Sequence, residues 1–95
     1  MSLDAALNAF SKVQARYSKF GAGDTEPRGV LTDLIEQVHG GNEPTVPTTA
    51  RGWQIFTGMP GSEAAAAAMG AAGKAVVEAA KTDAIGTARY MRNYY

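Results

Sequence analysis

The chain has 95 residues, no cysteine, and nine basic and nine acidic residues that give a formal net charge of zero. This length provides for a single domain, and the absence of cysteine excludes disulfides and thiolate metal sites. The balanced charge disfavours a protein that holds nucleic acid by bulk electrostatic attraction.

Residues 2–20 carry the clearest helical pattern. Apolar residues recur at alternating spacings of three and four, as at the a and d positions of a coiled coil: Leu3, Ala6, Phe10, Val13, Tyr17 and Phe20. Ser2 is a suitable N-cap, and Gly21 stands where glycine commonly ends a helix. An amphipathic helix is therefore predicted. Its basic residues form either a solvated face or a surface for an anionic partner: Lys12, Arg16 and Lys19.

A second apolar stripe follows a short glycine-containing link. Its members are Val30, Leu31, Leu34, Ile35 and Val38. They predict a helix over 27–39, with Pro27 in the first turn and Gly40 after the end. Because the link is short, the two helices are expected to pack against each other as an antiparallel hairpin over 1–41.

Residues 42–61 are predicted to form an extended arm. The prolines of this segment are incompatible with a regular helix: Pro44, Pro47 and Pro60. The arm also holds the only tryptophan, Trp53, which is followed by Ile55 and Phe56. Because a lone strand is not stable in water, these side chains are expected to pack either across the preceding hairpin or on a neighbouring subunit.

Residues 62–95 are predicted to form one long helix, because they are rich in alanine, the strongest helix former, and Ser62 can cap them. Gly86 is the expected place for any bend or break. A helix of about 30 residues is about 45 Å long at 1.5 Å per residue, which exceeds the width of a globule of this chain length. The helix is therefore expected to protrude as a rod from an isolated chain.

Small residues on this helix would let another helix approach closely. The ones expected to form that contact are Ala66, Gly70 and Gly73. The alternative is that alanine only fills an exposed helix surface.

Arginines and tyrosines alternate at the C-terminus. The residues concerned are Arg89, Tyr90, Arg92, Tyr94 and Tyr95. Tyrosine side chains suit a contact between proteins, since one end of the ring is apolar and the other polar. Nucleic acid is the weaker alternative, with aromatic rings stacked on bases and arginines beside phosphates.

No arrangement typical of an enzyme or a cofactor site occurs. The sequence contains no GxxxxGK[ST] loop, no GxGxxG fingerprint, no HExxH motif and no EF-hand loop. The only histidine, His39, has no nucleophile or carboxylate set beside it and is expected to be structural at a helix end. We therefore expect no catalytic residue, no cofactor and no metal.

The sequence as a whole predicts an all-α chain with a hairpin over 1–41, an arm over 42–61 and a helix over 62–95. Alanine, whose burial contributes little, supplies much of the 45% hydrophobic content, so the core is expected to be thin. The first hypothesis is a non-enzymatic assembly subunit of a filament, a secretion apparatus or a virion. Its expected interface residues are Phe10, Tyr17, Trp53, Phe56, Ala66, Gly70, Gly73, Tyr90 and Tyr94.

The second hypothesis is a small monomeric helical module. It would bind a peptide, a membrane surface or nucleic acid through the groove of the hairpin or through the basic and aromatic C-terminus. The uncharged stretch 64–73 is too short to span a bilayer, and the chain does not begin with a secretory signal pattern. The expected location is therefore the cytoplasm or an assembled particle.

Overall fold

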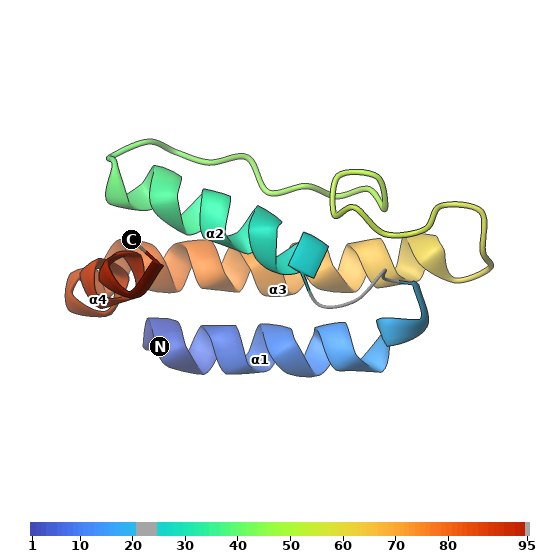
Figure 1. Cartoon of the computed structure of the whole chain (residues 1–95), viewed down its shortest axis with the longest axis horizontal. Coiled ribbons are helices and arrows are strands. Elements are labelled where there is room, and N and C mark those ends of the chain that lie inside the picture. The colour runs from blue at the N-terminus through green and yellow to red at the C-terminus, as the bar shows by residue number, and fades with distance from the viewer. Residues whose placement is uncertain (21–24, 95) are drawn as a thin grey trace.

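The computed structural model describes residues 1–20 and 25–94, with side chains for all of these except 20, 25–28 and 94. Over the described residues there are four α-helices, one short 3-10 helix and no strand, which confirms the predicted all-α class. The elements are α1 (Leu3–Arg16), η1 (Ser18–Phe20), α2 (Thr25–His39), α3 (Ser62–Thr82) and α4 (Ala84–Tyr94) (Figure 1).

Helix α1 forms where the apolar spacing predicts it. The Oγ of Ser2 accepts a hydrogen bond from the Ala5 N–H at 3.1 Å, so Ser2 is the N-cap. One face of the helix is buried, and its members are Leu3, Ala6, Phe10 and Gln14. The α-helix ends at Arg16, and η1 continues the chain with a tighter turn.

Helix α3 is the centre of the molecule. Both α1 and α2 pack mainly on α3 and have little contact with each other among the described residues. The prediction of a directly packed hairpin over 1–41 is therefore wrong. The reason is that α3 is buried on several sides, and its alanines and glycines allow close approach from each of them.

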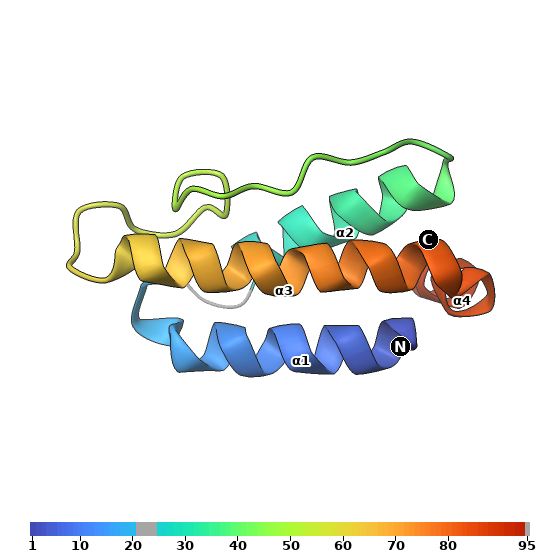
Figure 2. The same cartoon turned by 180° about the vertical axis from the view of Figure 1, so that it is seen from behind.

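The predicted arm is observed as a long non-helical segment that runs back along α3 (Figures 1 and 2). Trp53 is 0% exposed, and its ring centroid lies 5.3 Å from that of Phe10 in α1. The indole Nε1–H donates a hydrogen bond to the backbone oxygen of Pro47 at 2.7 Å. Of the two sequence alternatives, the structure therefore has Trp53 packed within its own chain.

The predicted continuous helix over 62–95 is wrong. Helix α3 ends at Thr82, and α4 begins at Ala84 and folds back against α2 and α1 (Figures 1 and 2). The break is at Asp83, and Gly86 lies within α4. No rod protrudes: the radius of gyration is 12.8 Å and the longest extent is 39 Å, as expected for one compact domain of this length.

The buried side chains form one core that joins α1, α2, α3, α4 and the arm. Its largest fully buried members are Trp53, Phe10, Leu3, Ile35, Met69 and Val76. Within residues 1–20 and 25–94, no helix combines the length and the apolar character needed to cross a membrane.

Candidate functional site

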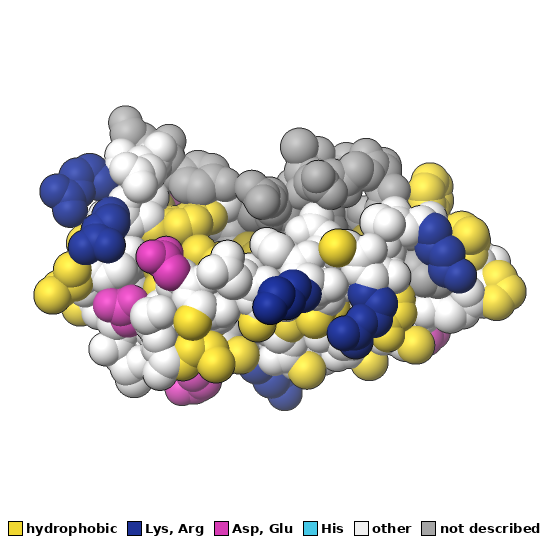
Figure 3. All heavy atoms as spheres, turned by 90° about the horizontal axis from the view of Figure 1, so that it is seen from below, with side chains coloured by type: hydrophobic (Ala, Val, Ile, Leu, Met, Phe, Trp, Pro, Cys, Tyr) yellow, Lys and Arg dark blue, Asp and Glu magenta, His cyan; other side chains and the backbone are white. Residues whose placement is uncertain are grey.

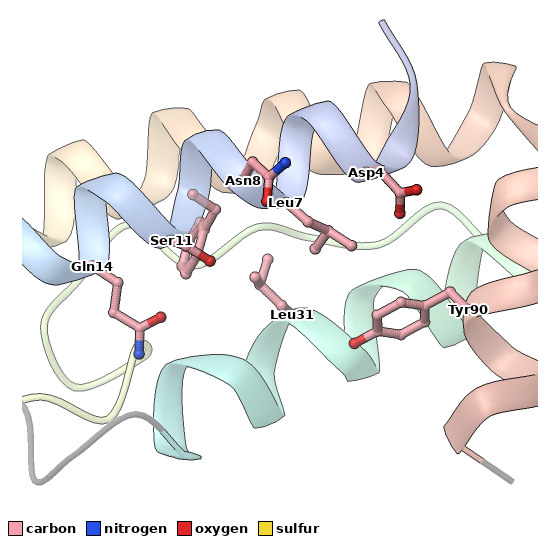
Figure 4. Close-up of a pocket in the computed structure, with 8 residues that line it drawn as sticks. Asp4, Leu7, Asn8, Ser11, Gln14, Leu31 and Tyr90 are labelled. Carbon is pink, nitrogen blue, oxygen red and sulfur yellow. The ribbon is translucent and has the colours of Figure 1, made fainter.

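A cavity of about 410 Å³ lies between α1, α2 and α4 (Figure 4). It exists because α1 and α2 both rest on α3 without closing on each other. Its apolar lining is formed by Leu7 and Phe10 of α1 and Leu31 of α2, and Tyr90 of α4 adds an aromatic wall. We refer to this feature as the α1/α2/α4 cavity.

The rim of the α1/α2/α4 cavity is polar. One side of α1 supplies it with Asp4, Asn8, Ser11 and Gln14. Spacings of three and four place these residues along one stripe of the helix, and the first three are exposed to solvent. The cavity therefore combines an apolar interior with hydrogen-bonding groups at its edge, which is the usual make-up of a binding site.

Tyr90 is held in place at the cavity wall. Its hydroxyl lies 2.8 Å from the hydroxyl of Thr32 in α2, and this hydrogen bond links α4 to α2. Figure 4 shows the ring beside Leu31 and the Tyr90 hydroxyl directed toward α2. The tyrosine is thus a fixed part of the cavity.

Asp83 determines where α4 lies. Its Oδ1 accepts a hydrogen bond from the Gly86 N–H at 3.0 Å, and its Oδ2 accepts one from the Leu3 N–H at 2.9 Å. One carboxylate therefore caps α4 and also ties the start of α1 to the junction. These two bonds, led by the one from Leu3, hold the pKa of Asp83 below its usual value of 3.8.

A buried hydroxyl reinforces the junction between α3 and α4. The Oγ1–H of Thr87, which is 3% exposed, donates a hydrogen bond to the Ala80 backbone oxygen at 3.0 Å. The last carbonyls of a helix lack partners within it, so this bond satisfies one of them for α3. Together with Asp83, it keeps α4 folded against the rest of the chain.

A second cavity of about 480 Å³ lies where the ends of α2 and α3 meet the start of α4. Lys81 donates a hydrogen bond to Glu43 at 2.7 Å there, and this bond raises the pKa of the lysine. His39 also lines this cavity and is exposed. Lys81 and Glu43 form an ion pair, so their charges neutralise each other at this cavity.

The small residues of α3 that are predicted to contact another helix pack against the arm of their own chain. A Cβ atom on Gly73 would lie 2.9 Å from the Trp53 ring, and one on Gly70 would lie 3.2 Å from the backbone oxygen of Pro47. Ala66 is also fully buried. In this structure these three residues therefore contact their own chain, whereas the sequence predicts another helix at this position.

The remaining predicted interface residues lie apart. Phe10 is buried against Trp53, Tyr17 is half-buried against the core, and Tyr90 lines the cavity. Phe56 is 57% exposed and lies in the turn before α3. The side chain of Tyr94, like residue 95, is outside the described part of the structure.

The basic row along α1 and η1 faces solvent. Lys12, Arg16 and Lys19 are all exposed, and Figure 3 shows Lys and Arg side chains spread along the face that includes α1. No acidic side chain forms an ion pair with Lys12 or Arg16 among the described residues. The solvated face and the anionic partner both stay open as interpretations of this row.

The sequence interpretation missed two features of the fold: the role of Asp83 at the junction, and the cavity that Leu7, Leu31 and Tyr90 line together. For Asp83 a signal is present, because aspartate is among the preferred N-cap residues and stands inside an otherwise alanine-rich helical pattern. For the cavity no local signal exists, because its lining comes from three helices.

In the part of the chain that the structure describes, no three His, Cys, Asp or Glu side chains are arranged to hold a metal ion. No protein family model, curated protein or solved structure matches the chain. The candidate sites therefore stand on their geometry alone.

Proposed function

We propose that the protein is a non-enzymatic subunit that assembles through contacts between chains. The observation that carries this proposal is exposed apolar surface at one end of the molecule. Phe56 is 57% exposed and Met59 is 42% exposed, and both lie in the turn before α3. Full burial of such a side chain contributes about 1.5–3 kcal/mol, so covering the exposed part of both residues contributes a share of that to association.

The contrast with the rest of the arm supports this proposal. Trp53 and Ile55 are 0% and 6% exposed, whereas the next residue, Phe56, points away from the core. Single exposed apolar residues are common on monomeric proteins, but neighbouring ones are typical of interaction surfaces. The protruding rod and the close helix contact that the sequence predicts do not support assembly, because no rod protrudes and the arm covers Gly70 and Gly73 of α3.

Sedimentation velocity from the micromolar to the millimolar range tests the proposal. We expect a weight-average mass that rises above the 9.9 kDa of one chain as the concentration increases. Phe56→Ser should lower the association without changing the helical circular dichroism, because Phe56 is not part of the core. A wild-type protein that sediments as a monomer at every concentration would contradict the proposal.

The α1/α2/α4 cavity favours a second candidate function, a monomeric module that binds a peptide or a small apolar ligand. Its volume of about 410 Å³ lies within the range of ligand pockets, about 300–1,000 Å³. In this case the protein would stay monomeric, and a ligand would shift the NMR signals of Leu7, Leu31 and Tyr90. Unchanged signals across a library of small apolar fragments and short peptides would count against this function.

A further inference from the structure

We propose that copies of the chain join head to tail, with Phe56 of one copy inserted into the α1/α2/α4 cavity of the next. This inference rests on the proposed assembly function and names the two surfaces that meet. The exposed donor is the turn at 56–61, and the acceptor is the cavity between α1, α2 and α4. The occupant is thus a second copy of this chain.

The cavity has the size and the lining that a phenyl ring needs. A closed apolar cavity of about 150 Å³ accommodates benzene, whereas this one measures about 410 Å³ and is open at an exposed rim. Leu7, Leu31 and the ring of Tyr90 provide apolar and aromatic contacts for Phe56. Enough space remains beside the ring for the unbranched side chain of Met59.

The charges of the two surfaces are complementary. Residues 44–61, which include the donor turn, contain one charged side chain, Arg51, and it is exposed. Among the residues whose side chains the structure describes, Asp4 is the charged one that lines the cavity, and it is also exposed. Arg51 of one copy therefore has a residue of opposite charge, Asp4, available at the cavity rim of the next.

The positions of the two surfaces determine the kind of assembly. The donor turn lies beyond the start of α3, at the end of the long axis opposite α4, and Tyr90 of α4 forms part of the cavity (Figures 1 and 2). The donor turn cannot fill its own cavity without a rearrangement of the arm. A contact between two different surfaces is heterologous, so it forms a ring or an open chain of subunits.

The contact would extend beyond the inserted side chain. A stable interface covers about 800 Å² on each partner. Insertion of Phe56 alone covers only a small part of that area. The polar rim residues Asn8 and Ser11 would therefore also lie in the contact, beside the arm of the neighbouring copy.

Two variants each disrupt one of the two surfaces and leave the other intact. Phe56→Ser removes the inserted side chain, and Ser11→Trp, at an exposed position on the rim, obstructs the cavity. Serine and tryptophan have similar helix propensities, so α1 should form in the second variant. Each variant should self-associate about 5- to 20-fold more weakly than the wild type, the factor that corresponds to covering the 57% of the Phe56 side chain that is exposed.

Two control variants test whether the weaker association is specific to Phe56 and to the cavity. Ile85→Ser removes a side chain that is 74% exposed but does not line the cavity, and Ala15→Trp adds an indole at an exposed position of α1 outside the cavity lining. Both controls should associate like the wild type. Thermal melts followed by far-ultraviolet circular dichroism would verify that all four variants are folded.

The decisive experiment mixes the Phe56→Ser and Ser11→Trp variants in equal amounts. The first keeps its cavity and the second keeps its Phe56, so we expect a 1:1 heterodimer with twice the 9.9 kDa mass and no larger species. A wild-type protein that is monomeric throughout would contradict the assembly function itself. A wild-type protein that associates, with variants that also associate normally or a mixture that stays monomeric, would overturn only the head-to-tail contact.

Discussion

The packing of Trp53 on α3 can be tested by adding a single methyl group at Gly73. An ideal Cβ at this position would lie 2.9 Å from two carbons of the indole ring and 3.2 Å from a methyl group of Val46. The ring cannot move away easily, because it is fully buried, packs on Phe10 and is hydrogen-bonded to Pro47. The substitution Gly73→Ala should therefore destabilise the fold.

The expected magnitude follows from two opposed effects. Replacing a glycine inside a helix by alanine stabilises it by about 1 kcal/mol, whereas overpacking a dense core destabilises by about 1–3 kcal/mol. Gly29 in α2 provides the matched control, because it is exposed and a Cβ there would meet no atom within 4 Å. Gly29→Ala should show only the stabilising effect, so the free energies of unfolding of the two variants should differ by about 1–3 kcal/mol.

Urea unfolding of the wild type and both variants, followed by circular dichroism at 222 nm, measures this difference. Thermal melts should agree, because about 1 kcal/mol corresponds to a shift of about 4–8 °C for a domain of this size. If Gly73→Ala and Gly29→Ala raise the stability equally, the indole does not pack on Gly73. The intramolecular position of the arm would then be refuted.

Three further predictions concern the core and the junction between α3 and α4. Trp53 should be shielded from acrylamide quenching equally at low and high protein concentration, because it is buried within its own chain; quenching that increases on dilution would instead place it in a contact between chains. Because the folded pKa of Asp83 lies below 3.8, its carboxylate stabilises the fold above about pH 4 and loses that contribution as the pH falls through the folded pKa. Urea unfolding at neutral and acidic pH should therefore show a smaller loss of stability on acidification for Asp83→Asn than for the wild type, and equal losses would contradict the two hydrogen bonds. Thr87→Val should destabilise by about 1–2 kcal/mol, because the Ala80 oxygen loses its partner, whereas Thr82→Val at the exposed end of α3 should change stability by less than about 0.5 kcal/mol.

The candidate site could be predicted only in part. The place of Phe56 in a proline-rich arm predicts it as an interface residue, but the same pattern predicts Trp53, which the fold buries. A local pattern identifies apolar side chains that are expected to be buried. It does not determine whether the same chain or a neighbouring chain buries them. Tyr90 likewise stood out in the sequence, but its position at a cavity depends on how α4 turns back.

The sequence by itself determined the helices and the arm, because these follow from interactions between near neighbours. Apolar spacing defined α1 and α2, alanine propensity defined most of α3, and proline excluded a helix between 42 and 61. Only the tertiary structure decided that the last helix breaks. The break rests on contacts between distant residues, above all the hydrogen bond from the Leu3 N–H to Asp83, which joins positions that are 80 residues apart. Helix propensity favours a continuous helix through Asp83, whereas hydrogen bonds between distant residues stabilise the break.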